Sequence, residues 1–309
     1  MSEQSSWPDD FRAGFACIVG RPNAGKSTLT NAMVGQKVAI TSDRPETTRR
    51  VIRAIVNRDH GQIILVDTPG LHRPRTLLGE RLNDMVRDSL AGVDVVVMCL
   101  PADEAIGPGD RFLLDLVSQM NVPIIAAVTK TDRVGRDDLA AHLVEVSEMA
   151  PFVDVVPVSA TMGEQVDVLA EVVLDQMPDS PPLYPRDAIS DESEETLISE
   201  LIREAALEGL HAELPHSLAV TVEEMLDEQP RKGDPDQRPI LRVHASLHVE
   251  RDSQKGIIIG KGAARLKRIK RDARKGIEPL LGARVTLDLH VRVAKDWQRD
   301  PKLLGRLGF

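Results

Sequence analysis

A glycine-rich segment near the N-terminus has the residue types that bind the phosphates of a nucleotide. It fits the pattern G-x-x-x-x-G-K-[ST] with Gly20, Arg21, Pro22, Asn23, Ala24, Gly25, Lys26 and Ser27. Gly20 and Gly25 let the backbone wrap a β-phosphate, so that successive N–H groups point inward at a helix N-terminus. Lys26 would reach the β- and γ-phosphates, and the hydroxyl of Ser27 is placed to bind Mg²⁺. The alternative, a glycine turn beside a surface lysine, is disfavoured by the strand pattern before the segment and the helix pattern after it.

A second segment could complete a magnesium and γ-phosphate site. It reads Asp67-Thr68-Pro69-Gly70-Leu71 and follows a short apolar run. An aspartate just past a buried strand end can hold Mg²⁺ through water, and the N–H of Gly70 can reach a γ-phosphate. The pattern D-x-x-G alone also describes a plain turn, so its weight comes from the phosphate loop before it.

Two further segments could read the base. Thr129-Lys130-Thr131-Asp132 follows one apolar run, and Ser159-Ala160 follows the next. A carboxylate at Asp132 can accept hydrogen bonds from N1 and N2 of guanine, which adenine cannot supply. The stem of Lys130 can lie over the base plane, and a backbone N–H at Ser159 or Ala160 can bond guanine O6. This arrangement favours GTP over ATP.

The elements around these segments alternate between strands and helices. A short apolar run predicts a strand at 15–19, and continuous apolar runs predict strands buried on both faces at 94–100, 123–128 and 153–158. Helical patterns lie between them at 28–34, 78–90, 109–118, 138–149 and 164–177. Residues 51–56 and 62–66 alternate and flank a turn, which predicts a hairpin. The expected fold is α/β, with a mostly parallel doubly wound sheet that carries one antiparallel edge strand.

A proline-rich stretch divides the chain. Four prolines between residues 177 and 185 predict a stiff linker. We expect a flexible N-terminus at 1–12, a GTPase domain at 13–178, the linker at 179–190 and a second domain at 191–309. In the second domain the predicted order is helix, strand, strand, helix, strand, at 194–210, 217–225, 240–250, 262–280 and 285–294.

Charge separates the two ends of the chain. The net charge is −9, but residues 240–309 hold 17 Lys and Arg against 7 Asp and Glu, or +10. The other 239 residues therefore carry −19. Several of the basic residues follow the glycine turn at 260–262, which we interpret as a strand-to-helix turn. Such a turn lets a nucleic-acid backbone approach closely, with positive charge around it. A solvated basic face without a partner is the alternative.

Composition excludes several classes of protein. Apolar residues make up 42% and charged residues 28%, which is ordinary for a globular chain. No apolar stretch approaches the ~20 residues that span a bilayer, and the acidic N-terminus does not resemble a secretory signal. Cys17 and Cys99 lie in separate apolar runs, which predicts buried thiols in a reducing cytosol.

Taken in order, the motifs resemble those of Ras-related GTPases, and more narrowly the TrmE-Era-EngA-like GTPase family. The narrower resemblance comes from Pro22-Asn23, Thr47-Thr48-Arg49 and Asp67-Thr68-Pro69-Gly70-Leu71. The second domain resembles the type II KH domain of the Era-type members. That resemblance rests on Gln254-Lys255-Gly256-Ile257-Ile258-Ile259-Gly260-Lys261-Gly262, the basic helix after it, and the ending from Trp297 to Phe309.

The resemblance implies a function, cofactors and partners. Era-type proteins bind GTP and GDP, hydrolyse GTP with Mg²⁺, and bind single-stranded RNA near the 3′ end of 16S ribosomal RNA. They act in maturation of the small (30S) ribosomal subunit and are found at the inner face of the cell membrane. We therefore expect a cytoplasmic monomer that associates with the membrane peripherally. The implied RNA-binding residues are Lys255, Gly256, Ile259, Gly260, Lys261, Gly262, Ala263, Arg265, Lys267, Arg268 and Arg271.

The resemblance also implies catalytic roles. Leu71 stands where Ras has the glutamine that orients water, so another group must stabilise the leaving charge. In this family a K⁺ ion is implied, held partly by the residue at Asn23. The implied catalytic residues are Asn23, Lys26, Thr48 and Gly70, and the implied Mg²⁺ ligands are Ser27, Thr48 and Asp67. Residues 41–50 and 71–77 are the expected switches.

Two departures from the family pattern bear on affinity. Thr129 replaces an asparagine that bonds the base and tethers the phosphate loop, so binding of guanine is expected to weaken. In the G-x-x-G turn of the KH domain, the fourth position is Ala263, which resists the positive φ that glycine adopts.

These departures keep a second hypothesis open. In it, the chain is an RNA-binding assembly module whose nucleotide site is largely structural and hydrolyses GTP weakly. A GTPase that acts on tRNA or membrane, with an incidental basic tail, is a third reading that the KH pattern disfavours.

Overall fold

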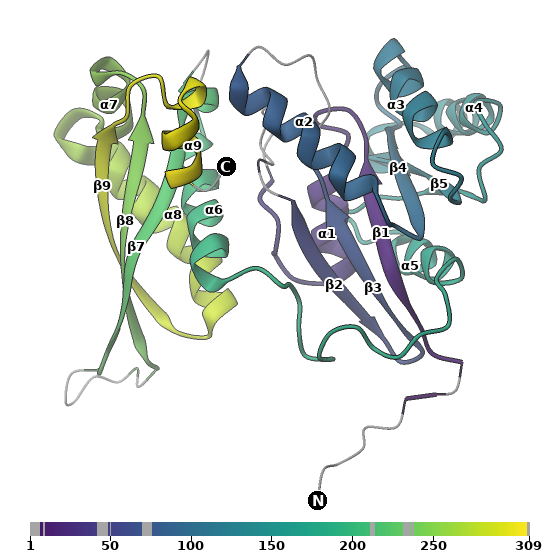
Figure 1. Ribbon diagram of the computed structural model, residues 1–309, viewed down its shortest axis with the longest axis horizontal. Coiled ribbons are helices and arrows are strands. Elements are labelled where there is room, and N and C mark those ends of the chain that lie inside the picture. Colours follow the sequence, from purple (N-terminus) through teal and green to yellow (C-terminus); the bar gives the residue numbers. More distant parts are fainter. Residues whose placement is uncertain are drawn as a thin grey trace, which may run out of the picture. The chain divides into compact units, whose positions relative to one another are not determined.

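The structure is a computed structural model that describes residues 7–8, 10–41, 49, 51–69, 76–210, 214–230, 236 and 238–307 (Figure 1). The chain forms two compact units. One holds residues 1–73 and 82–191, and the other holds residues 74–81 and 192–309. Within the described ranges, no helix is both long and apolar enough to cross a membrane.

The first unit is built on a six-stranded sheet with strand order β2-β3-β1-β4-β5-β6. β2 and β3 form the predicted hairpin and pair antiparallel, whereas the other neighbours pair in parallel. The predicted α/β fold with one antiparallel edge strand is therefore confirmed. The strands are β1 (Arg12–Val19), β2 (Ile52–Arg58), β3 (Gly61–Asp67), β4 (Val95–Pro101), β5 (Ile124–Thr129) and β6 (Val155–Pro157).

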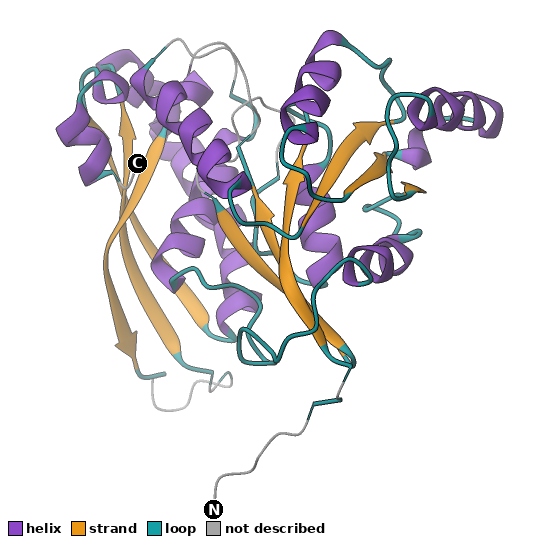
Figure 2. Ribbon diagram, turned by 45° about the vertical axis from the view of Figure 1, so that its right-hand side comes forward, coloured by secondary structure: helices purple, strands orange, loops and turns teal. Residues whose placement is uncertain are grey.

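Helices cover both faces of this sheet, as Figure 2 shows. Side chains of one strand alternate between the faces: Ala16 and Ile18 pack with α1 and α5, whereas Cys17 and Val19 pack with α2, α3 and α4. Continuous apolar runs are the result, since each strand is buried on both sides. The helices are α1 (Lys26–Val34), α2 (Leu77–Leu90), α3 (Pro108–Ser118), α4 (Arg136–Ser147) and α5 (Val166–Leu174).

Parallel pairing gathers the predicted motifs at one edge of the sheet. The phosphate loop follows β1, Asp67 ends β3 and Thr129 ends β5. β1 lies between β3 and β4 in the sheet. Carboxyl ends of parallel strands meet at one edge, where open α/β sheets bind their ligands.

The proline-rich segment after α5 runs along the edge of the first unit. Asp179 bridges to Arg12, and Ser190 bridges antiparallel to Ala54 of β2. The buried side chain of Gln62 accepts hydrogen bonds from the backbone N–H groups of Leu183 and Tyr184, at 2.8 and 2.9 Å. The segment is therefore bonded to the sheet along much of its length.

The second unit is a three-stranded sheet, in the order β7-β8-β9, packed on helices. β7 pairs antiparallel with β8, and β9 pairs in parallel with β8. One face of the sheet packs on α6 and α8 through Val243, Ala245, Leu247 and their neighbours. The elements are α6 (Glu194–Leu207), η2 (Leu214–Ser217), β7 (Ala219–Glu228), β8 (Ile240–Val249), α7 (Asp252–Ile259), η3 (Lys261–Ala263), α8 (Ala264–Leu281), β9 (Arg284–Val293), η4 (Trp297–Arg299) and α9 (Pro301–Arg306).

The structure corrects the prediction before the glycine turn. A strand-to-helix turn is wrong, because the turn joins two helices, α7 and α8. Gly256 and three successive isoleucines lower helix propensity, so the sequence pattern does not predict α7. The side chain of Gln254 nevertheless accepts hydrogen bonds from the N–H groups of Glu250 and Arg251, at 2.9 and 3.0 Å, and so caps the helix.

α8 runs unbroken through Gly276. An added Cβ there would lie 3.1 Å from the side chain of Leu201, so glycine allows α6 and α8 to pack closely. The sequence pattern also did not predict the two short helices η4 and α9 at the end of the second unit. It is anchored by the buried Trp297, whose indole N–H donates to the carbonyl of Ser217 at 3.0 Å.

Candidate functional site

The phosphate loop links β1 to α1 and has the backbone that its glycines predict. Gly25 adopts φ 89°, and Asn23 adopts φ 64°. A Cβ added to Gly20 would lie 2.9 Å from the carbonyl oxygen of Cys99 and 3.1 Å from Cβ of Ala24. Gly20 is therefore required by the space beneath the loop, and Gly25 by its left-handed conformation.

The ammonium of Lys26 lies within this loop. Its Nζ donates to the carbonyl oxygens of Gly20 and Arg21, both at 3.0 Å. Burial lowers the pKa of Lys26, while the nearby carboxylate of Asp67 opposes that shift. The loop thus holds a buried cation where the β- and γ-phosphates are predicted to bind.

Ser27 and Asp67 meet as predicted for a magnesium site. The hydroxyl of Ser27 donates to Oδ2 of Asp67 at 2.8 Å. Burial raises the pKa of Asp67 to about 6, against the opposite effects of Lys26 and Ser27. Oδ1 of Asp67 is buried and has no hydrogen-bond partner within the described part of the chain. An orphaned carboxylate oxygen beside a hydroxyl fits Mg²⁺, which takes oxygen ligands and usually only one or two carboxylates.

Thr68 and Pro69 continue from Asp67, and the hydroxyl of Thr68 donates to the carbonyl of Ile18 at 3.0 Å. This bond fixes the start of the segment to β1. Thr48, Gly70 and Leu71, with most of both expected switches, lie outside the described residues.

In the family pattern, the asparagine at position 129 bonds both the base and the phosphate loop. Thr129 keeps the bond to the phosphate loop. Its hydroxyl donates to the buried carbonyl of Ala24 at 2.7 Å, so the tether to the phosphate loop is present. The threonine hydroxyl carries a single hydrogen, and this bond uses it. Thr129 therefore has no donor left for the base.

Asp132 is held in position by the neighbouring loop. The hydroxyl of Ser159 donates to its Oδ1 at 2.6 Å, and that of Thr161 lies 3.4 Å from the same atom. The Ser159 bond is the main cause of a lowered pKa for Asp132. The carboxylate is thus ionised at neutral pH, as an acceptor for guanine N1 and N2 must be. Ala160 packs against the core, and the N–H of Thr131 donates to the carbonyl of Val158 at 3.4 Å.

The predicted RNA turn has the conformation of a glycine loop. Gly260, Gly262 and Ala263 have φ values of 72°, 58° and 60°. Lys261 and Gly262 are exposed between α7 and α8. Ala263 therefore adopts the left-handed conformation that disfavours a side chain, which explains why a glycine is usual at this position.

Ala263→Gly is expected to stabilise the protein by about 0.5–1 kcal/mol, since relief of left-handed strain exceeds the added entropy of the unfolded chain. Ala264→Gly is the matched control, because Ala264 has φ −62° and begins α8. It should destabilise by up to about 1 kcal/mol. Urea unfolding followed through the buried Trp297 measures both. Effects of the same sign for the two variants would contradict the assigned turn conformation.

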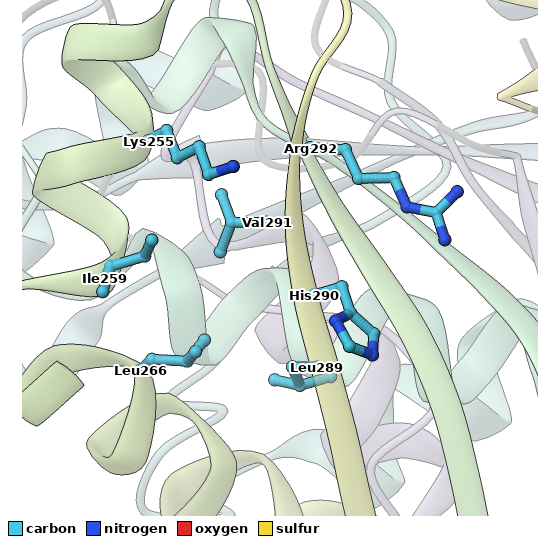
Figure 3. A pocket seen from close by; sticks show the side chains of 7 residues that line it. All are labelled: Lys255, Ile259, Leu266, Leu289, His290, Val291 and Arg292. Carbon is cyan, nitrogen blue, oxygen red and sulfur yellow. The ribbon is translucent and has the colours of Figure 1, made fainter.

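A groove lies between α7, α8 and β9. It has a volume of about 440 Å³ and is lined by Lys255, Ile259, Leu266, Leu289, His290, Val291 and Arg292. Figure 3 shows Ile259, Leu266 and Val291 directed into the same space, with the Lys255 ammonium near Val291. His290 and Arg292 lie on the other side of β9. The groove thus combines apolar side chains, which suit a base, with the cationic side chains of Lys255 and Arg292.

Sequence reasoning identified Lys255 and Ile259 but missed the contribution of β9. The alternation of Leu289 and Val291 with polar residues was the available signal. Gly256 faces open space, since an added Cβ would meet no atom within 4 Å.

The predicted basic residues of α8 do not all face solvent. Lys267, Arg268 and Arg271 are exposed, and Arg271 pairs with Asp272 at 3.1 Å. The guanidinium of Arg265 instead donates to the carbonyls of Ala206 and Glu208, at 3.2 and 2.6 Å. Arg265 therefore holds the end of α6 in the described structure.

Comparison with known proteins finds a separate family match in each of the two units. Residues 15–130 match the family described as 50S ribosome-binding GTPase, and residues 213–298 match the KH domain. With the phosphate loop and the Asp132 loop, these matches define a P-loop GTPase joined to a KH domain.

The chain belongs to the Era family of GTPases. It is 60% identical to GTPase Era of Mycolicibacterium smegmatis over 97% of this chain and 99% of the relative. It is 58% identical to GTPase Era of Streptomyces coelicolor, over 96% of this chain and 95% of that one. The prediction of a GTP-hydrolysing enzyme is confirmed.

Two solved Era structures match most of the chain. One is Aquifex aeolicus Era bound to GDP·AlF₄⁻, and the other is Era with MgGDPNP and nucleotides 1506–1542 of 16S ribosomal RNA. Each is 34% identical with a TM-score of 0.89, and covers 96% of this chain and 99% of the other. The predicted GTPase and KH folds are confirmed.

Proposed function

We propose that this chain is a GTP-driven switch that binds single-stranded 16S rRNA near its 3′ end and assists maturation of the 30S subunit. The proposal is carried by two features in one chain: the Ser27–Asp67 pair at the phosphate loop and the Gly260–Ala263 turn beside an apolar groove. The Era structure with 16S nucleotides supports the choice of RNA.

In this proposal the phosphate loop binds through its backbone N–H groups and Lys26, whose buried position strengthens its attraction to phosphate oxygens. Mg²⁺, held by Ser27 and through water by Asp67, would neutralise charge between the β- and γ-phosphates. Asp132 accepts from guanine. Thr48 and Gly70, which lie outside the described residues, complete the proposed set.

RNA recognition combines two physical contributions in the second unit. The exposed Lys261, Lys267 and Arg268 supply phosphate contacts, which any sequence can satisfy. The apolar groove beside them can accept unstacked bases and read their edges. Binding should therefore depend on both salt and sequence.

Lys261→Asp in the full chain should weaken binding of a 16S 3′-end oligonucleotide by roughly tenfold, because it places a negative charge at the turn. Lys302→Asp is the matched control and should have a smaller effect, as Lys302 lies near the C-terminus. Fluorescence anisotropy at two salt concentrations measures both, with a scrambled oligonucleotide for comparison. Equal affinity for the two oligonucleotides at both concentrations would leave only a non-specific basic patch.

Hydrolysis is proposed to use K⁺ near Asn23, whose φ of 64° and exposed position set it at the mouth of the loop. A cation beside the β–γ bridge would act where an arginine finger acts elsewhere. Asn23→Ala should leave GDP affinity within about threefold and remove the K⁺ stimulation. Single-turnover hydrolysis in K⁺ and in Na⁺ tests this, and equal rates for the unmodified protein would refute it.

We further propose that the protein works as a cytoplasmic monomer that contacts the inner face of the membrane only peripherally. The +10 charge of residues 240–309 supports attraction to anionic surfaces, RNA and lipid alike. Flotation with anionic and neutral vesicles, with and without RNA, tests the membrane contact. The absence of flotation with anionic vesicles would remove it.

A further inference from the structure

Guanine binding in this chain lacks one contact that the family pattern supplies. The hydroxyl of Thr129 donates to Ala24 and offers no second hydrogen. Base recognition therefore depends on Asp132, held by Ser159, on the backbone N–H predicted to bond guanine O6, and on how Lys130 is held. The following inference rests on the proposed role of Lys130 over the base plane.

Two carboxylates from the loop after β4 hold the Lys130 ammonium. Nζ of Lys130 lies 3.2 Å from Oδ1 of Asp103 and 3.3 Å from Oε1 of Glu104. The lysine side chain is only 17% exposed, and its backbone has φ 58°. A non-glycine residue adopts this conformation only when its surroundings fix it. The side chain is thus fixed at both its backbone and its charged end.

The loop after β4 is bonded both to the phosphate loop and to the segment 129–133 after β5, here called the base-reading loop. Arg133 reaches Asp103 at 3.1 Å, and Arg21 of the phosphate loop reaches Glu104 at 3.4 Å. Arg21 also donates to the fully buried Asp110 at 2.7 Å. The result is a row of alternating charges: Arg133, Asp103, Lys130, Glu104, Arg21 and Asp110.

Asp110 fixes the far end of this row. Its second carboxylate oxygen accepts from the N–H of Gly107 at 2.8 Å and so caps α3. Arg21 is therefore directed toward the β4–α3 loop, where it pairs with Glu104 and donates a hydrogen bond to the carbonyl of Ala105.

We propose that Asp103 and Glu104 are positioning residues for guanine nucleotide binding. They hold the Lys130 ammonium so that its stem lies along the base, and through Arg21 they tie the base-reading loop to the phosphate loop. This second link supplements the Thr129–Ala24 tether.

The test is the double variant Asp103→Asn/Glu104→Gln, assayed for GDP binding by calorimetry and for GTP hydrolysis. We expect GDP affinity to fall about fivefold, because both ion pairs of Lys130 are lost, together with the Arg133–Asp103 and Arg21–Glu104 pairs. KM for GTP should rise by a similar factor while kcat stays unchanged. The matched control is Asp137→Asn/Glu145→Gln on exposed α4, which makes the same change in net charge.

A double-mutant cycle separates positioning from a general structural effect. In a Lys130→Met background, which keeps the stem and removes the ammonium, the same double substitution should change GDP affinity little. An equal fivefold loss in that background, or no loss in the unmodified background, would overturn the inference. If the double variant does not fold, Glu104→Gln alone, at a partly exposed site, takes its place in the same assays. Failure of the unmodified chain to bind GDP would instead refute the proposed nucleotide site.

Discussion

Lys26→Ala should weaken GDP and GTP binding by about a hundredfold or more, because it removes a buried cation from the phosphates. The contacts of Lys26 within the loop make this the largest expected effect in the nucleotide site. Its Nζ bonds to two loop carbonyls, and Asp67 lies near enough to influence its pKa. Calorimetry with GDP in the presence of Mg²⁺ measures the loss.

The fold should survive this change, since the buried strands beneath the loop do not depend on the ammonium. Arg136→Ala, on the exposed face of α4, is the control and should bind GDP as the unmodified protein does. GDP affinity of Lys26→Ala equal to that of the unmodified protein would show that the phosphates bind elsewhere.

Asp132→Asn should reduce guanine affinity by about a hundredfold and admit xanthine nucleotides, because a donor replaces an acceptor at the base edge. The structure makes this substitution unusually informative. Ser159 donates to Oδ1 at 2.6 Å, and an asparagine oxygen can accept the same bond. The loop can thus keep its shape while the other atom changes from acceptor to donor.

Competition of GDP and xanthosine diphosphate for a fluorescent nucleotide measures this change. Asp137→Asn is the matched control, an exposed aspartate at the start of α4 that should leave the preference unaltered. If ATP competes as well as GTP against the unmodified protein, Asp132 does not select guanine.

The buried sheet and its motifs were predictable because burial on both faces imposes continuous apolar runs. The phosphate loop, Asp67 and Asp132 each follow such a run, so the topology of a parallel sheet places them together. The Ser27–Asp67 hydrogen bond follows from that placement. The second-domain fingerprint was recognisable because its glycines impose a fixed backbone at 260–263.

Other features were not predictable because they depend on distant partners. α7 is a helix despite Gly256 and its β-branched residues, since packing and a Gln254 cap outweigh propensity. The Thr129 tether needs the carbonyl of Ala24, far away in sequence. Arg265 and Lys130 looked like ligand contacts, and only the structure shows which backbone carbonyls and carboxylates hold them.

The bonding of the proline-rich segment to β2 changes where the first unit can be cut. β2 is the outermost strand of its sheet, and the backbone of Ile189 and Asp191 bonds to Ile55 and Arg53. An exposed strand edge is a template for aggregation, and here the chain covers part of that edge with its own downstream residues. A GTPase fragment that ends at 178 would lose this cover, whereas one that extends through Asp191 would keep it. Length changes between those positions would also shift the register, so the segment cannot be treated as a freely adjustable spacer.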